Sequence, residues 1–425
     1  MRLLTLLVLC GLLAAGCASS EEAAPDSIGF ADDPVTLTVW GWDGVFPDGV
    51  VELFEQENPD IRIEVRTSDF DQHHTGLQDA IALEGSLPDV AALERTYLPE
   101  FLAHADRFVD LREFGAGDLE GDYLDWRWAE GVAATNEVIG LPTDVGGLAL
   151  AYRKDLFAEA GLPSEPDEVA PLLSNWDSFI AFGQRYVDSG VGAYFIDGSD
   201  SLYRVRLAQE EFTYVDTDGN PTIDDTVASA WNFALDVSDR NLAANLPQFS
   251  PEWNAGFADR SFAAIAAPSW MRGYIQNIAP ETDGLWSIVP VPEVGGNWGG
   301  SQLTVPADTP HPEEAWRFVR YMTSVETQLE LFRQNGNFPS TPELYEYPEV
   351  VELDDPFFDG QNVGRIYVDS VEALSPQPST PRERDLEQVF MERLWIATYE
   401  REEADDFWEE ARAEGLAIIE AASTD

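Results

Sequence analysis

Apolar and polar residues alternate along two short stretches in the N-terminal third of the chain, which is the pattern of half-buried strands. These stretches are residues 35–40 (VTLTVW) and 61–66 (IRIEVR), and residues 89–93 form a third short stretch of strand type. Helical patterns at residues 50–57 and 76–84 lie between them. Strand, helix, strand, helix and strand in this order, with short loops, predict a parallel, doubly wound α/β sheet.

In such a sheet the ligand lies beyond the carboxyl ends of the strands. We therefore expect the loops that start at Trp40, Thr67 and Glu94 to contribute to a binding site. Further elements of the same two kinds are expected along the rest of the chain: a strand at 147–152, a helix around Phe157, strands at 257–267 and 286–291, a long helix at 312–333 and terminal helices within 384–422.

Residues 216–220 (DTDGN) are acidic enough to suggest a calcium loop. Gly219, however, comes two positions too early for an EF-hand, and no acid follows at the required spacing. We therefore predict a hairpin turn at this place.

The N-terminus has the features of an export signal. Arg2 is followed by an apolar run from Leu3 to Leu13 and then by small residues up to Cys17. A helix that spans a membrane needs roughly 20 apolar residues, and this run is too short. Residues 1–17 are therefore predicted to be a signal peptide, and residues 18–32, rich in Ser, Ala, Asp and Glu, a flexible tether.

The residues before Cys17 resemble the lipobox of bacterial lipoproteins, in which the Cys is diacylated and becomes the mature N-terminus. The usual Leu lies three residues before the Cys, where this chain has Ala14, with Leu13 one position further back. The resemblance implies a lipid anchor on the extracytoplasmic face of a membrane, and the alternative is simple secretion with a free Cys17. The only other cysteine, Cys10, lies in the signal, so the mature chain has no disulfide.

The charge of the chain is strongly acidic. It has 79 Asp and Glu against 24 Lys and Arg, a net charge of −55, which excludes nucleic acid as a partner. Self-repulsion of this size destabilises a compact state unless salt screens it, so we expect a halophilic or salt-tolerant source. A strongly cationic ligand is the competing explanation. The acidic residues are spread along the whole chain, which favours the first explanation.

Four blocks of sequence resemble the family 1 extracellular solute-binding proteins of bacterial ABC importers, to which maltose-binding protein is related. They are residues 79–90, which end in GSLPDV; residues 140–162, with NWD at 175–177; residues 257–270, which end at Trp270; and residues 290–318. The four blocks occur in the family's order and span most of the mature chain.

The resemblance implies a type II periplasmic-binding-protein fold, in which two discontinuous α/β lobes close over a ligand about a hinge. The expected crossings between lobes are at 144–147, 298–301 and 337–341. They divide the chain into an N-lobe of residues 33–145 and 301–337 and a C-lobe of residues 146–300 and 338–425. A monomer that delivers its solute to the permease subunits of the importer is implied, with no cofactor.

A carbohydrate is the favoured solute. Sugars need aromatic rings that stack on their C–H faces, and carboxylates, amides or Arg that bind their hydroxyls. Trp40 and Trp42 follow the first strand, and one of them is expected to face the cleft, with Trp42 or its neighbour Asp43 the better candidate. The full set of candidate ligand-binding residues is Trp40, Trp42, Asp43, Asp71, Glu94, Asp144, Trp270, Arg272 and Trp298.

Two other functions stay open. One is the same fold with a cationic solute such as a polyamine, and the other is a secreted carbohydrate-active enzyme that uses two carboxylates. No nucleophile motif, zinc motif or phosphate loop accompanies the acids, so we predict a binding protein and not an enzyme. The four histidines do not have metal-ligand spacing, and the adjacent pair His73 and His74 is expected at the surface. Four tryptophans are expected to be structural: Trp126, Trp128, Trp176 and Trp316.

Overall fold

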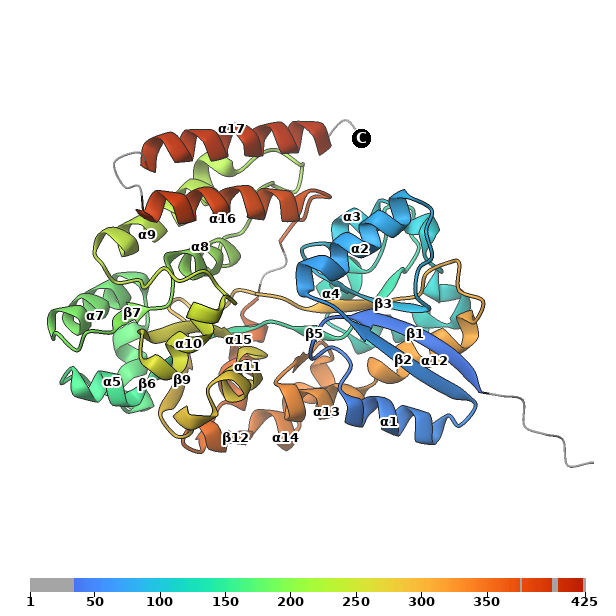
Figure 1. Cartoon of the computed structure of the whole chain (residues 1–425), viewed down its shortest axis with the longest axis horizontal. Coiled ribbons are helices and arrows are strands. Elements are labelled where there is room, and N and C mark those ends of the chain that lie inside the picture. The colour runs from blue at the N-terminus through green and yellow to red at the C-terminus, as the bar shows by residue number, and fades with distance from the viewer. Residues whose placement is uncertain (1–33, 375–376, 400–403, 423–425) are drawn as a thin grey trace, which may run out of the picture. The chain divides into compact units, whose positions relative to one another are not determined.

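The computed structural model describes residues 34–374, 377–399 and 404–422 and contains two main β-sheets (Figure 1). The predicted signal peptide, Cys17 and the predicted tether lie outside the described residues. Within the described ranges, no helix is both long enough and apolar enough to cross a membrane.

The first sheet has five strands in the order β2-β1-β3-β10-β4. Strand β1 pairs in parallel with β2 and β3, as the alternating order of strands and helices predicted, while β10 pairs antiparallel with β3 and β4. The carboxyl ends of β1, β2 and β3 therefore lie along one edge. The elements are β1 (Val35–Gly41), α1 (Asp48–Glu57), β2 (Ile61–Thr67), α2 (Phe70–Ala82), β3 (Val90–Glu94), α4 (Asp125–Glu130), β4 (Gly140–Pro142) and β10 (Ser301–Thr304).

The second sheet has four strands in the order β7-β8-β6-β9. Its central strand β6 pairs antiparallel with β8 and β9, and β7 pairs in parallel with β8. The elements are β6 (Leu148–Arg153), α5 (Lys154–Glu159), α7 (Trp176–Asp188), β7 (Tyr194–Ile196), α8 (Ser199–Ala208), α10 (Pro251–Asp259), β8 (Phe262–Pro268), α11 (Met271–Ile278) and β9 (Trp286–Pro290).

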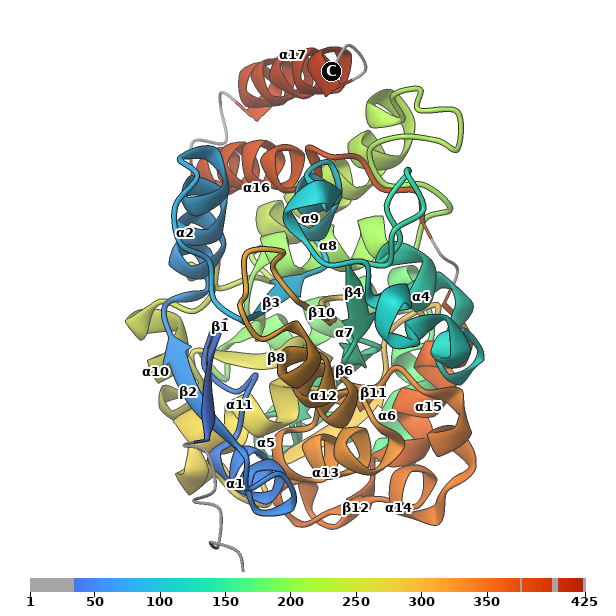
Figure 2. The same cartoon turned by 90° about the vertical axis from the view of Figure 1, so that its right-hand side faces the viewer.

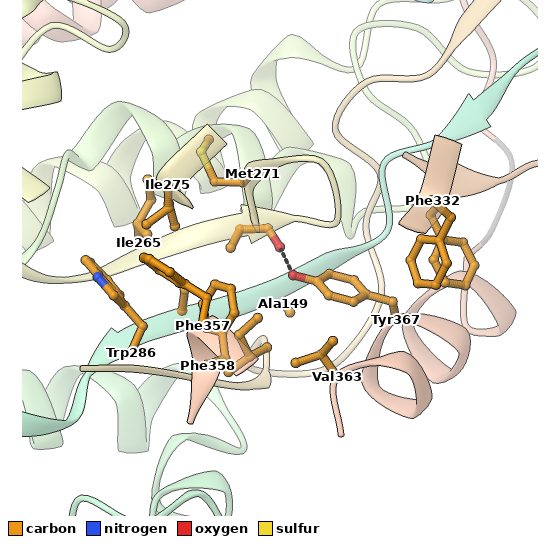
Figure 3. Packing of buried hydrophobic residues seen from close by; sticks show 14 of the residues in the cluster. Ala149, Ile265, Met271, Ile275, Trp286, Phe332, Phe357, Phe358, Val363 and Tyr367 are labelled. Atoms are coloured by element: carbon orange, nitrogen blue, oxygen red, sulfur yellow. Dashed lines mark hydrogen bonds between the residues drawn. The ribbon is translucent and has the colours of Figure 1, made fainter. Parts of the chain in front are cut away.

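Strand β6 is buried along its whole length because both of its faces are covered. On one face, Leu150 and Tyr152 pack with the aromatic residues of α5 and α7. On the other, Ala149 and Ala151 pack into a cluster that includes Trp286 and Tyr367. Figure 3 shows this second cluster, in which the Tyr367 hydroxyl donates a hydrogen bond to the Ala267 carbonyl oxygen at 3.2 Å.

In the described residues, the chain passes from one sheet to the other at two places, near 144–147 and 298–301. It leaves β4 through β5 (Asp144–Val145) and enters β6, and later it passes from β9 to β10. The third crossing expected from the sequence, 337–341, contains the short strand β11 (Phe338–Pro339). Strand β5 pairs antiparallel with β11, so two of these segments run side by side.

The C-terminal helices pack as a layer beside the second sheet. Helix α16 (Glu383–Tyr399) lies against α17 (Ala404–Ala422), α8 and α9 (Ala228–Asp239), and both views show α16 and α17 side by side (Figures 1 and 2). Buried Trp231, Phe390 and Ala411 join these helices in one apolar cluster. The predicted turn at 216–220 is confirmed, because Val215 and Pro221 bridge antiparallel across it.

Three predicted elements differ from the structure. The helix expected at 76–84 is α2, which begins earlier, at Phe70, and ends at Ala82. The expected helix at 312–333 is two helices, α12 (Pro312–Met322) and α13 (Val325–Asn335), because Ser324 caps α13 by accepting a hydrogen bond from the backbone N–H of Thr327 at 3.3 Å. The expected strand at 257–267 starts later, at Phe262. Residues 257–259 end helix α10, and Arg260, in the left-handed conformation with φ of 60°, turns the chain into the strand.

Candidate functional site

The edge of the first sheet at which the strands end carries a cluster of aromatic rings. Trp42 follows β1, and its ring centroid lies 5.1 Å from that of Phe70, 5.5 Å from that of His73 and 5.1 Å from that of His74. All three neighbours belong to α2. Trp42 is half-buried, so part of the indole is exposed beside this helix.

The two histidines are buried, and the expectation that they lie at the surface is wrong. His73 and His74 are 3% and 0% exposed, because α2 turns both toward the sheet, where His73 Nε2 lies 2.7 Å from the Ala92 carbonyl oxygen. His74 Nε2 accepts from the Glu94 N–H at 3.0 Å, so its Nδ1 donates to the Phe70 carbonyl oxygen at 2.8 Å. Burial lowers the pKa of His73 and lowers that of His74 to about 3, so both rings are neutral at pH 7.

Tyr97 links this cluster to a carboxylate and a guanidinium. Its ring stacks on His74 with a centroid distance of 4.0 Å and an interplanar angle of 5°. Its hydroxyl donates to Asp71 Oδ1 at 2.7 Å and accepts from Arg384 Nε at 3.2 Å. Trp42, Asp71 and Glu94, three of the predicted residues, are thus joined through His74 and Tyr97.

Glu94 is held by further contacts at this edge, where the predicted residues Trp40 and Asp43 also lie. Glu94 is 8% exposed and accepts from the backbone N–H and the hydroxyl of Thr96, at 2.8 and 2.6 Å. Burial raises its pKa. Trp40 is half-buried, and its buried indole N–H has no hydrogen-bond partner among the described residues. Asp43 is exposed beyond the end of β1.

The second sheet contributes a pair of tryptophans. Trp270 follows β8, and Trp298 lies in the crossing between β9 and β10; their ring centroids are 5.6 Å apart at an angle of 82°. The Trp270 indole N–H donates to the Trp298 carbonyl oxygen at 3.0 Å. Phe249 lies 6.3 Å from Trp270 and is 47% exposed. The fold thus brings two of the candidate residues into contact.

An arginine that no sequence pattern marked lies over Trp298. The guanidinium of Arg204, on α8, is 4.5 Å from the centroid of the Trp298 ring. It donates to Glu387 Oε1 and to Gln248 Oε1, each at 2.9 Å. These residues come from two helices and a loop that are far apart in sequence, so only the fold reveals that they share a place with Trp298.

A buried carboxyl lies nearby, at the end of β7. Asp197 is fully buried and accepts from the Ser201 hydroxyl at 2.8 Å and from the Trp253 indole N–H at 3.0 Å. Burial first, and the charge of Asp200 second, raise the pKa of Asp197 to about 7. Burial also raises the pKa of Asp200, and the nearby positive charge of Arg204 opposes this shift.

Two predicted residues are engaged in internal contacts. Asp144 is 5% exposed and accepts from the Thr143 hydroxyl at 2.6 Å and the Ser301 N–H at 3.0 Å, so its carboxylate joins two crossing segments. Arg272 Nη1 lies 2.5 Å from Asp355 Oδ2, with Phe332 and Tyr367 beneath its guanidinium. Both of those rings belong to the core cluster of Figure 3. These contacts indicate that Asp144 and Arg272 stabilise the fold.

A surface groove of about 800 Å³ lies elsewhere, between α1 and the helices α12 and α13. It is lined by Leu53, Phe54, Trp316 and Tyr321 among others, and none of the nine predicted residues lines it. The aromatic and polar side chains at the strand ends, and not this groove, are therefore the candidate site. In the part of the chain that the structure describes, no three His, Cys, Asp or Glu side chains are placed to hold a metal ion.

Comparison with known proteins decides the family. The sequence profile of the bacterial extracellular solute-binding proteins matches residues 49–356, which is most of the chain. The chain belongs to this family. Membership confirms the prediction of an exported solute-binding protein and not an enzyme.

Solved structures and characterised relatives agree with this assignment. A crystal structure described as an extracellular solute-binding protein of family 1 is 31% identical, with a TM-score of 0.80, and covers 91% of this chain and 100% of that one. The two-lobed type II fold is therefore confirmed. The arabinooligosaccharide-binding protein of Halalkalibacterium halodurans is 26% identical over 87% of this chain and 86% of its own length. The lactose-binding protein of Rhizobium radiobacter is 25% identical over 78% and 81%.

Proposed function

We propose that this solute-binding protein captures a mono- or oligosaccharide between its two lobes and delivers it to the permease of an ABC importer. The observation that carries the proposal is the contact of Trp270 with Trp298 at the end of β8, beside the exposed ring of Phe249. Flat aromatic faces are what the apolar C–H surface of a sugar needs. The two relatives named above bind an arabino-oligosaccharide and lactose by their descriptions.

Unpartnered polar atoms at the same strand ends support a ligand rich in hydroxyl groups. Ser269, which precedes Trp270, is fully buried, and its hydroxyl has no partner among the described residues. The same is true of the buried indole N–H of Trp40 at the end of β1. A buried donor or acceptor is destabilising until it is satisfied, and sugar hydroxyls or ordered water would satisfy both.

The charges around the site favour a neutral ligand over a polyamine. Asp71 is paired with Arg384 at 2.8 Å, and Glu387 is paired with both Arg204 and Arg384 at 2.9 Å. These carboxylates are therefore already neutralised by arginines. Burial raises the pKa of Glu94, which disfavours its charged form further.

Titration calorimetry tests the proposal, with arabino-oligosaccharides, lactose, maltose and spermidine as ligands at low and at molar salt. We expect one of the sugars to bind at both salt concentrations. Trp298→Ala should weaken that binding by about 1 to 3 kcal/mol, through lost stacking and burial. Trp395→Ala is the control, because this residue of α16 is 39% exposed and lies eleven positions past Arg384, roughly 16 Å along the helix. Binding of spermidine alone, lost in molar salt, would replace the sugar with a cationic solute.

The lobe boundaries proposed for this mechanism are residues 33–145 with 301–337 and residues 146–300 with 338–425. The change of sheet between β4 and β6, and again between β9 and β10, supports them. Trp42, Asp43, Asp71 and Glu94 would then face Trp270 and Trp298 across the cleft. Small-angle X-ray scattering with and without the bound sugar should show a decrease in the radius of gyration on closure.

The location proposed for the mature protein is the extracytoplasmic face of a membrane, with Cys17 lipidated. Metabolic labelling with a radioactive fatty acid should label the wild-type chain and not Cys17→Ser. A labelled Cys17→Ser variant, or an unlabelled wild type that is secreted, would contradict the anchor. Light scattering on the purified chain should give the mass of a monomer.

A further inference from the structure

The first turn of α16 contacts residues of α2 and of the segment after β3, beside the first sheet, and a residue of α8, beside the second. Arg384 donates to Asp71 of α2 at 2.8 Å and to the Tyr97 hydroxyl at 3.2 Å. It also donates to Glu387, one turn further along α16, at 2.9 Å. Glu387 accepts from Arg204, which covers Trp298. Figure 1 shows the beginning of α16 close to α2.

A second series of charged contacts runs from the same turn of α16 to the segments that cross between the sheets. Arg95, which follows β3, donates to Glu383 at 3.2 Å and to Glu130 at 3.0 Å. Glu130 is paired with Arg127. Arg127 is fully buried and donates to the carbonyl oxygens of Asp144, at 3.1 Å, and of Ser301, at 2.8 Å. The contacts of α16 thus reach the segments about which the lobes would move.

The two series of charged contacts differ in their exposure to solvent. The side chains of Arg95 and Glu383 are 13% and 5% exposed, so this pair is hidden from solvent. The side chain of Asp71 is 61% exposed and that of Arg384 is 25% exposed, so this pair is accessible. Buried pairs are screened weakly by salt, and breaking one leaves an uncompensated charge. The exposed pair is the one that can break first.

The net charge of −55 gives these arginines a second effect. Two acidic lobes repel each other, and the repulsion favours separation of their facing surfaces. Arg95 and Arg384 each supply positive charge between a carboxylate of the N-lobe and a carboxylate of α16. The attraction between these arginines and their carboxylates therefore opposes the repulsion between the two acidic lobes.

We infer that residues 383–387 are an ionic latch, which limits how far the two lobes separate before ligand binds and slows the release of bound ligand. The inference concerns the regulation of the proposed sugar site, and its second part rests on that function. Opening must separate Arg384 from Asp71 and Tyr97, and Glu383 from Arg95. The latch also holds Arg204 over Trp298, because Glu387 binds both arginines.

Small-angle X-ray scattering on the unliganded protein tests the first part. Arg384→Gln should give a larger radius of gyration than the wild type, because the accessible arm of the latch is lost. Arg382→Gln is the matched control. It removes the same charge just before the same helix, but Arg382 is half-exposed and pairs with Asp385 of α16 at 3.2 Å. Equal radii for Arg384→Gln and Arg382→Gln would overturn the latch.

Stopped-flow measurement of sugar release tests the second part, with the sugar that binds in calorimetry. Arg384→Gln should release it about fivefold faster or more, and Arg382→Gln at the wild-type rate. Asp71→Asn changes only the exposed partner, so it provides a second test if Arg384→Gln does not fold. An unchanged release rate and radius in Asp71→Asn would also count against the latch. A wild type that binds no sugar would refute the proposed function, while the scattering comparison would still decide the latch.

Discussion

The buried carboxyl of Asp197 should make the stability of this protein fall as the pH rises from 4 to 7. Asp197 is 0% exposed and lies between the Ser201 hydroxyl and the Trp253 indole. Burial, together with the charge of Asp200, raises its pKa from 3.8 to about 7. The group is therefore protonated in the folded chain over a range in which the unfolded chain has released the proton.

Asp197→Asn isolates this effect because an amide fits the same hydrogen bonds. Its Oδ1 accepts from the Trp253 N–H, and its Nδ2 donates to the Ser201 oxygen. The Ser201 hydroxyl can then donate to the Gly198 carbonyl oxygen, which already lies 2.8 Å away. The variant thus reproduces the protonated acid without a group that titrates.

The magnitude follows from linkage. A raised pKa gives stability that is fully present below the ordinary value of 3.8 and is lost as the pH rises through about 7. Each pKa unit is worth about 1.4 kcal/mol, so the loss is about 3 to 4 kcal/mol in all. The asparagine variant does not lose it. Its free energy of unfolding, minus that of the wild type, should therefore rise by about this amount from pH 4 to pH 7.5.

Urea denaturation of both proteins at four pH values and constant salt measures this difference, in which the effects of the other carboxylates cancel. Asp216→Asn is a control whose own pH dependence lies mostly below this range. Hydrogen bonds from Asn220 lower the pKa of Asp216, so its stabilisation is present above the ordinary pKa and is lost as the pH falls through the lowered value. A flat difference for Asp197→Asn between pH 4 and 7.5 would refute the protonated, buried carboxyl.

Three further predictions follow from the crossings, the core and the charge. In Gly146→Ala the new Cβ would lie 1.9 Å from the Trp298 carbonyl oxygen, so thermal unfolding should show that the folded state loses about 1 to 3 kcal/mol of stability or more. Gly121→Ala is the control, because its new Cβ would have no atom within 4 Å and stability should not change. Arg272→Met leaves the buried Asp355 carboxylate without its ion-pair partner, so the free energy of unfolding should fall by about 3 to 5 kcal/mol while sugar affinity stays unchanged. A loss of sugar affinity without a loss of stability would show instead that Arg272 contacts the ligand. Raising NaCl from 0.1 to 1 M should raise the unfolding temperature, because the Debye length falls from about 10 to 3 Å, and a decrease would contradict the salt-tolerant interpretation.

The parts of the fold that the sequence predicted are those whose pattern is local. The alternation at 35–40 and 61–66 corresponds to β1 and β2. Successive side chains of a strand point to opposite faces of the sheet, so the alternation of apolar and polar residues is enough to predict both strands. The break between α12 and α13 was missed because the apolar spacing continues across Ser324, whose effect depends on a single capping hydrogen bond. Helix boundaries of this kind follow from one side chain and not from periodicity.

The same distinction between local pattern and long-range contact applies to the residues of the candidate site. Trp270 and Trp298 could be chosen because each stands in a distinctive segment, after small residues or among glycines. Arg204, Arg384 and Asp197 could not, because each owes its place to partners more than 40 residues away. The burial of His74 could not be predicted either, because it depends on the packing of α2 against the end of β3, where Glu94 donates to its ring.

The position of the arginines changes how the acidic composition is understood. The net charge of −55 causes repulsion over the whole surface, and salt screens this repulsion. Yet Arg95 and Arg127 have side chains that are 13% and 0% exposed, and both lie between carboxylates or carbonyl oxygens that join separate segments. Salt reaches the exposed carboxylates more readily than these two side chains. Added salt should therefore relieve repulsion across the surface while the buried pairs near the crossings keep most of their attraction, so that higher salt favours the closed arrangement of the lobes.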